Sequence, residues 1–392
     1  FAAYEARELK SRYNGIVMTN LISSAPNFQY VGDGVLNPNF PPTGQGSIQT
    51  GTSVFGNLTY SLMDKYLFSG TLRYDGSSIF GANRKYGTFP ALSAGWRISQ
   101  EKFMDHISWI DDLKLRASWG KAGNDAIPPG TQFGLIRSND PIYGGYDLGG
   151  TNLSQILGAY ASQIGNPDIH WETNITTNIG LDAAFWNNRI TAGFNWFNRK
   201  TSDLLYEPPY TGTAGAASAP YKNIMSFTNK GIELELGLHG GNPDKIGYDI
   251  NFNISGYRSN VDFIDGDSAT FIDLAIFAPT HYNLTRSQVG HPVSSFYGFV
   301  HNGTFQNMDD VLNSPTQPGI STTDPSGIGH FKFKDISGPN GKPDNNIGPE
   351  DQTFLGNPSP KFSYGFNLNL YYHHFDLGIF VQGVQGNKIF NY

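Results

Sequence analysis

The stretch that decides the fold is Ser53–Ile98, which reads SVFGNLTYSLMDKYLFSGTLRYDGSSIFGANRKYGTFPALSAGWRI. Apolar and polar side chains alternate through it in three runs, and a period of two residues is typical of β-strands. Only Met63–Lys65 separates the first two runs, whereas the long, polar, glycine-rich stretch Asp75–Gly87 separates the second from the third. A short turn at one end and a long loop at the other predict a β-barrel of the outer-membrane type.

The composition of the 392-residue chain agrees with a barrel and argues against other classes. Hydrophobic residues make up 38%, aromatic residues 14% and charged residues only 15%, yet mean hydropathy is −0.36. No run of about eighteen apolar residues could form a membrane helix, and a barrel explains this because only alternate residues meet lipid. A net charge of −7 argues against a nucleic-acid partner. The absence of cysteine excludes disulfides, thiolate catalysis and cysteine-ligated zinc.

The same alternation recurs along the chain and predicts about a dozen strands. The clearest hairpin is Thr173–Asp203, which turns at Asn187 and Asn188, because asparagine tolerates the positive φ of tight turns. The last hairpin turns at His373-His374, and a further strand is expected at Phe296–Val300. Long loops are expected at Ser11–Thr50, Lys121–Trp171, Thr201–Lys230, Arg258–Pro292 and Asn302–Pro360.

The strand Leu113–Trp119 shows which way its faces point. Leucine and tryptophan alternate there with Lys114 and Arg116. A lysine or arginine that faced lipid near the middle of the membrane would cost about 2–4 kcal/mol. We therefore expect the apolar face to point outward and the charged side chains to face the lumen.

We expect one domain over residues 1–392, a partial antiparallel transmembrane barrel with short periplasmic turns and long extracellular loops. Residues 1–52 would be a strand end and a long loop, and 53–300 strands with long loops. Residues 301–360 would be a long loop with a damaged cation-binding motif, and 361–392 a final hairpin. The first residues, FAAYEARELK, contain no export signal, so the chain is expected to begin partway through a protein.

Several motifs resemble one family in the order in which that family carries them. They include SGTLRYDGSSIFGANRKYGTFPALSAGWRISQEKFM, LKLRASWGKAGN, WETNITTNIGLDAAFWNNRIT, NKGIELEL and TFLGNPSPKFSYGFNLNLYYHHFDLGIFVQGVQGNKIFN. These resemble the barrel of SusC/RagA-type TonB-dependent transporters, the outer-membrane nutrient importers of Bacteroidota. The resemblance implies a twenty-two-stranded barrel, an N-terminal plug, a TonB-contacting segment and a SusD-like lipoprotein lid. The plug, that segment and the final strands are not in this sequence, so a segment of a larger protein is expected.

The function that this resemblance implies is active import of oligosaccharides or oligopeptides across the outer membrane. We find no complete catalytic motif of the GxSxG, HExxH, P-loop or GxGxxG type, so no enzyme and no cofactor are expected. One alternative is a passive porin, which needs neither plug nor lid. The other is a secreted β-rich glycan-binding protein or sugar hydrolase, which does not explain apolar faces repeated strand after strand.

The segment Phe331–Gly356 holds a candidate cation site. Oxygen-bearing side chains around a glycine suit a hard ion such as calcium, and here they are Asp335, Asn340, Asp344 and Asp351. The segment departs from an intact calcium loop because it is one residue longer, carries prolines and lacks the central aspartate. The competing interpretation is a rigid polar loop, and any ion would be structural.

Aromatic residues divide into two groups. Those in strands are expected to form a girdle at the membrane interfaces or a lipid-facing surface; they are Tyr66, Tyr74, Trp96, Trp119, Trp186 and Trp196. Aromatics in the long loops are better candidates to meet substrate, because flat rings suit sugar faces and peptide side chains; they are Tyr143, Tyr146, Tyr160 and Tyr210.

Overall fold

The computed structural model describes most of the chain. The described residues are 1–21, 35–37, 43–138, 145–146, 156–208, 215, 217–242, 245–264, 271–277 and 282–391. Within them, only the backbone is described at residues 43, 45, 145, 146, 156, 157, 274–277 and 282.

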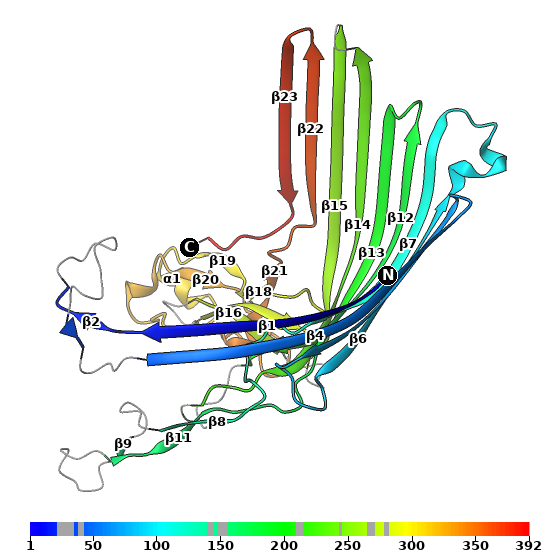
Figure 1. Ribbon diagram of the computed structural model, residues 1–392. Helices are drawn as coiled ribbons and strands as arrows, with labels where there is room; N and C mark the ends of the chain where they lie inside the picture. Colours follow the sequence, from blue (N-terminus) through cyan, green and yellow to red (C-terminus); the bar gives the residue numbers. More distant parts are fainter. Residues whose placement is uncertain are drawn as a thin grey trace.

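One antiparallel sheet of eleven strands dominates the molecule and confirms the all-β prediction (Figure 1). Each strand pairs with the next one in chain order, and β1 and β23 form the edges of the described sheet. In order, the strands are β1 (Ala2–Gly15), β4 (Thr43–Leu62), β5 (Tyr66–Ser77), β6 (Tyr86–Arg97), β7 (Ile110–Asn124), β12 (Glu172–Phe185), β13 (Ile190–Tyr206), β14 (Lys222–Asn242), β15 (Ile246–Ile264), β22 (Phe362–Tyr372) and β23 (Phe375–Gln385).

The connections alternate between tight turns at one end of the sheet and long excursions at the other (Figure 1). We call these the short-turn end and the long-loop end. The predicted turns are confirmed: Met63 and Asp64 both have φ 56°, Asn187 and Asn188 have φ 57° and 58°, and His373 has φ 54°. Positive φ at such positions matches the twist of the two strands that a tight turn joins.

A compact connection between β6 and β7 also lies at the short-turn end. It consists of two 3₁₀ turns, η3 (Ile98–Gln100) and η4 (Lys102–Met104). Between them the Glu101 carboxylate accepts hydrogen bonds from Tyr66 Oη at 2.6 Å, Trp96 Nε1 at 3.1 Å and Lys65 Nζ at 3.2 Å. The Tyr66 hydroxyl, followed by the indole and the ammonium, holds the pKa of Glu101 below its ordinary value. The side chains of Tyr66 and Trp96 are thereby fixed in position.

The two faces of the sheet differ in polarity, as the alternation predicts. On one face, apolar residues lie side by side from strand to strand: Leu236 of β14 pairs with Ala192 and Phe252, and Phe252 in turn pairs with Phe366. Leu115 shares this face and Arg116 lies on the other, so the predicted separation of apolar and charged side chains is confirmed. An exposed apolar band of this kind is suited to lipid.

The strands run further toward the long-loop end than predicted. β1 continues to Gly15 and β4 begins at Thr43, and the ladders of β13, β14 and β15 extend in the same way into the expected loops. Beyond the membrane both faces meet water, so the apolar alternation stops. The backbone ladder needs no such alternation and continues.

The connection from β15 to β22 is folded rather than a plain loop. Its four-stranded sheet consists of β16 (Phe271–Phe277), β17 (Tyr282–Gln288), β18 (Ser295–Phe299) and β21 (Gln352–Gly356). The strand predicted at Phe296–Val300 is therefore present as β18, but it belongs to this sheet and not to the large one. A five-residue helix, α1 (Met308–Leu312), and the strands β19 (His301–Thr304) and β20 (Phe331–Phe333) complete the connection.

Three short pairs of antiparallel strands lie within the β1–β4 and β7–β12 connections. They are β2 (Met18–Thr19) with β3 (Val35–Leu36), β8 (Leu135–Ser138) with β11 (Ala159–Gln163), and β9 (Gly145–Tyr146) with β10 (Ile156–Leu157). None of the helices in the described part of the chain is long and apolar enough to cross a membrane.

The buried core lies at the long-loop end. One cluster consists of Ile224, Met225, Val261, Ile264 and Ile272, and a second of Ile79, Phe80, Ile127 and Ile169. These clusters join the protruding strands to the folded connections. The long-loop end therefore has packed cores of its own, on which a binding surface can be built.

Candidate functional site: the polar wall and its rim

The polar face of the sheet forms a wall of amides, hydroxyls and paired charges. Arg116 of β7 donates two hydrogen bonds to Asp182 of β12, at 2.9 and 3.2 Å. Both side chains are more than a third exposed, so the pair contributes at most about 1 kcal/mol. Asn178 donates to Ser118 at 3.3 Å on the same face. Polar pairs of this kind leave a hydrophilic surface on which a solute can exchange hydrogen bonds.

Acidic side chains gather further along the wall. Glu233 and Glu235 both project from β14 onto the polar face, and Asn195 donates to Glu233 at 3.4 Å. Nearer the short-turn end, His239 lies 2.8 Å from Asp249 of the neighbouring strand. This half of the wall therefore carries more negative charge than the half near Arg116.

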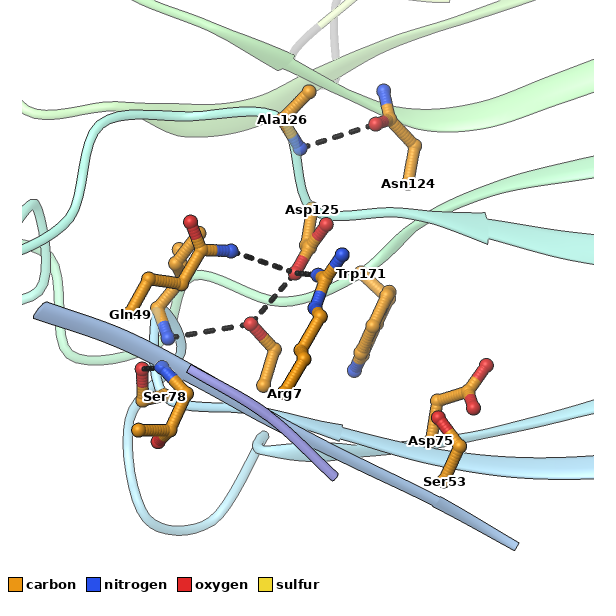
Figure 2. A network of polar contacts seen from close by, with 12 residues as sticks. Arg7, Gln49, Ser53, Asp75, Ser78, Asn124, Asp125, Ala126 and Trp171 are labelled. Atoms are coloured by element: carbon orange, nitrogen blue, oxygen red, sulfur yellow. Dashed lines mark hydrogen bonds and ion pairs between the residues drawn. The ribbon is translucent and has the colours of Figure 1, made fainter. Parts of the chain in front are cut away.

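A polar network at the rim joins four strands near the long-loop end (Figure 2). Its centre is the Asp125 carboxylate, directly after β7. It accepts hydrogen bonds from Arg7 of β1 at 3.3 Å, Gln49 of β4 at 3.4 Å and Ser77 of β5 at 2.7 Å. One carboxylate therefore fixes the spacing of β1, β4 and β5 where they leave the sheet.

The segment Asp75–Gly81 contributes Ser77 to this network and continues into a buried cluster. Its Phe80 is fully buried, and the ring lies 5.1 Å from that of Trp171. The Trp171 indole also donates to the carbonyl of Lys85 at 3.2 Å. The segment thus shapes the loop that follows β5, because its Ile79 and Phe80 supply part of a buried core.

The four candidate substrate tyrosines are only partly placed. Tyr143 and Tyr210 lie outside the described residues, and for Tyr146 only the backbone is described, in β9. Tyr160 of β11 lines a polar cavity of about 900 Å³ at the long-loop end. Contact of these tyrosines with substrate stays a prediction.

Sequence reasoning missed most of the residues that share this cavity with Tyr160. They include Tyr13 of β1, Arg137 of β8, Gln163 and Ser47. Tyr13 and Tyr160 are far apart in sequence, and no motif links them. Only the long excursion between β7 and β12 brings the β8–β11 hairpin near the protruding end of β1.

In the candidate cation segment, both carboxylate oxygens of Asp351 accept hydrogen bonds from backbone N–H groups. Asp351 is only 1% exposed. One carboxylate oxygen accepts hydrogen bonds from the N–H groups of Ile336 at 2.7 Å and Ser337 at 3.0 Å. The other oxygen accepts one from the N–H of Gly348 at 2.8 Å. Burial disfavours the charged carboxylate, but these three donors outweigh it and hold the pKa of Asp351 below its ordinary value.

The other three candidate ligands lie around the same loop. Asp335 accepts from the N–H of Asn345 at 2.6 Å and Asp344 from that of Asn346 at 3.0 Å, while Asn340 is exposed. The second oxygen of Asp335 is buried without a hydrogen-bond partner among the described residues. No group of three or more histidines, aspartates or glutamates that could hold a metal ion occurs in the described part of the chain. A structural cation here stays a prediction.

Comparison with known proteins identifies the family to which this chain belongs. A sequence model of the TonB dependent receptor-like β-barrel family matches residues 11–372. The chain belongs to this family. TonB-dependent receptor P26 of Formosa agariphila is 32% identical over 342 residues, which are 86% of this chain and 32% of that protein. TonB-dependent receptor SusC of Bacteroides thetaiotaomicron is 31% identical over 259 residues, 65% of this chain and 25% of SusC.

Solved structures agree on the fold. The RagAB peptide importer in its open-open state superposes with a TM-score of 0.75 at 20% identity, over 98% of this chain and 38% of the solved chain. The predicted resemblance to the SusC/RagA type and an outer-membrane location are thereby confirmed. The curated relatives are named as TonB-dependent receptors and the solved structure as a peptide importer, which argues against a secreted hydrolase. The chain spans about a third of the length of the first curated relatives that it matches.

Proposed function

We propose that this chain forms part of the wall of an active, TonB-dependent importer in the outer membrane. The observation that carries the proposal is a sheet with a continuous apolar face and a hydrogen-bonded polar face, in a chain whose family consists of TonB-dependent receptors. A sheet of this kind separates lipid from an aqueous lumen. The remainder of the twenty-two-stranded barrel, the plug and the TonB-contacting segment would be supplied by other parts of the protein.

We propose oligosaccharides or oligopeptides as the imported class. Amides, hydroxyls and paired charges on the wall suit solutes that carry many hydrogen-bonding groups. The cavity that contains Tyr13, Arg137 and Tyr160 adds rings and a guanidinium group, which suit sugar faces and peptide groups. A peptide is what the RagAB relative is described as importing.

We propose a SusD-like lipoprotein as the partner that closes over the long-loop end. Support comes from the folded connections there, because two buried clusters and a four-stranded sheet give a partner a surface of fixed shape. A simple porin has no need of such connections.

Uptake by living cells tests the proposal. Cells with the gene deleted, and cells in which it is restored, are offered labelled oligosaccharides and oligopeptides, with TonB present or removed. We expect uptake of one of these classes only when both the gene and TonB are present. Uptake that persists without TonB would instead indicate a passive porin.

A further inference from the structure

A hollow interrupts the apolar face of the sheet where β13, β14, β15 and the start of β22 lie side by side. Its volume is about 530 Å³. Trp196 of β13 pairs with Ile232 of β14, and Ile232 pairs with Gly256 of β15. The apolar residues that line the hollow are Phe194, Trp196, Ile232, Leu234, Ile254 and Phe362.

Gly256 makes the hollow possible. It stands where the neighbouring positions on this face carry large side chains, and it has none. A Cβ atom at this position would lie 2.7 Å from the backbone carbonyl of Lys361, so a larger residue does not fit without a shift of β22. The result is an apolar notch of about 530 Å³ in the surface that faces lipid, lined by Trp196 and Ile232.

Three cations line the same hollow on the side of the long-loop end: Lys230, Arg258 and Lys361. Lys230 and Arg258 are direct partners on adjacent strands. All three are exposed, and none has a salt bridge or side-chain hydrogen bond within the described residues. Like charges directly opposite each other on a sheet destabilise it. No carboxylate lines the hollow, so an anion that offsets their mutual repulsion would have to come from outside the residues that line it.

Along the strands, these cations lie at the level where lipid headgroups are expected. Ile232, Leu234, Leu236 and Leu238 form the apolar rows of β14, and Lys230 is the next residue on the same face toward the long-loop end. In outer-membrane barrels the long loops are extracellular. Lys230 and Arg258 therefore lie where the apolar band gives way to the outer-leaflet headgroups.

The geometry points to a specific site for one acylated, phosphorylated lipid of the outer leaflet, with a hydrocarbon chain in the notch beside Gly256 and a phosphate among Lys230, Arg258 and Lys361. Clustered lysine and arginine at headgroup level attract anionic lipid. An adjacent apolar notch adds selectivity for a lipid over a free anion. The site lies on the outer wall, so it does not depend on which solute the lumen passes.

Lipid binding to the intact, detergent-purified protein tests the site. The probes are lipid A with its phosphates, the same lipid after enzymatic removal of the phosphates, and inorganic phosphate, and native mass spectrometry counts the bound molecules. We expect one tightly bound lipid A, at least tenfold weaker binding of the dephosphorylated lipid, and no retention of phosphate alone. Equal binding of the two lipids, or no bound lipid A, would overturn the proposal.

A charge-neutral variant and a matched control locate the site. The variant K230Q/R258Q/K361Q is expected to bind lipid A at least tenfold more weakly than the unchanged protein. The control K102Q/K334Q/K342Q loses three exposed positive charges outside the hollow and is expected to bind lipid A normally. Equal binding by both variants, or equal loss from both, would show that the three cations do not form a site.

Discussion

Asp351 shows how one buried carboxylate organises a long connection. Its two oxygens accept hydrogen bonds from three backbone N–H groups in two separate parts of the connection. Replacement by asparagine puts an NH₂ donor where one of these oxygens accepts. We expect Asp351→Asn to destabilise the 331–356 segment by about 2 kcal/mol, the range for hydrogen bonds to a charged group. Limited proteolysis would detect this as faster cleavage within the segment, and Glu350→Gln, at the exposed neighbour, would leave the cleavage rate unchanged.

The stabilisation by Asp351 should depend on pH with a definite sign. Because the pKa of the folded carboxyl is depressed below 3.8, the charged form is the one that folding favours. Its contribution is therefore complete above pH 3.8 and is lost as the pH falls through the lower, folded value. Cleavage rates of the unchanged protein and of Asp351→Asn should differ at neutral pH and converge in acid. A difference that is independent of pH would contradict this account.

The predicted structural cation can be tested through thermal stability. The buried, unpartnered oxygen of Asp335 is the feature that favours an ion. With an ion bound among Asp335, Asn340, Asp344 and Asp351, excess chelator should lower the Tm, and added calcium should restore it. A Tm that is the same with and without chelator would remove the hypothesis and leave a rigid polar loop.

At these residues the sequence could name candidate side chains but not their neighbours in space. The sequence predicted Asp351 as a ligand of a structural cation, which stays a prediction, and no motif specifies the backbone N–H groups that its carboxylate binds. It identified Tyr160, but not Tyr13 or Arg137 in the same cavity. Contacts between distant loops are set by the whole fold, and alternation along one strand carries no information about them.

At the scale of the strand, the division into two faces is the property most open to test. Leu236 lies in the apolar band of β14, whereas Asn253 lies on the polar face of the adjacent strand. We expect Leu236→Arg to cost about 2–4 kcal/mol, because the charge enters lipid. Asn253→Arg should be tolerated, because it faces water and lies beside Glu235. The folded fraction in outer membranes, measured by heat-modifiable gel mobility, should fall only for Leu236→Arg.

The strands also show where sequence reasoning succeeds and where it stops. A two-residue period arises when one face meets lipid and the other meets water, and it predicted the membrane-spanning parts of β4 to β7 and β12 to β15. It could not predict the protruding ends of β1 and β4, where both faces meet water. The sheet of β16, β17, β18 and β21 was also missed, because its pairing joins segments that are far apart in the chain.

At the scale of the whole molecule, the chain forms a curved eleven-stranded sheet whose two ends differ (Figure 1). Tight turns occupy one end, and folded connections with packed cores occupy the other. The family places such a sheet in the outer membrane. Because long loops of such barrels are extracellular, we expect the cavity of Tyr160 and the rim network of Asp125 to lie on the cell surface. The importer proposal depends on this orientation.

Single-cysteine labelling tests the orientation most directly, because the chain contains no cysteine. Asp64→Cys places the thiol in a tight turn, and Lys342→Cys places it in an exposed part of the β15–β22 connection. Intact cells are treated with a bulky maleimide that does not cross the outer membrane. The account predicts that Lys342→Cys is labelled on intact cells, and Asp64→Cys only after the outer membrane is opened. Labelling of Asp64→Cys on intact cells would contradict it.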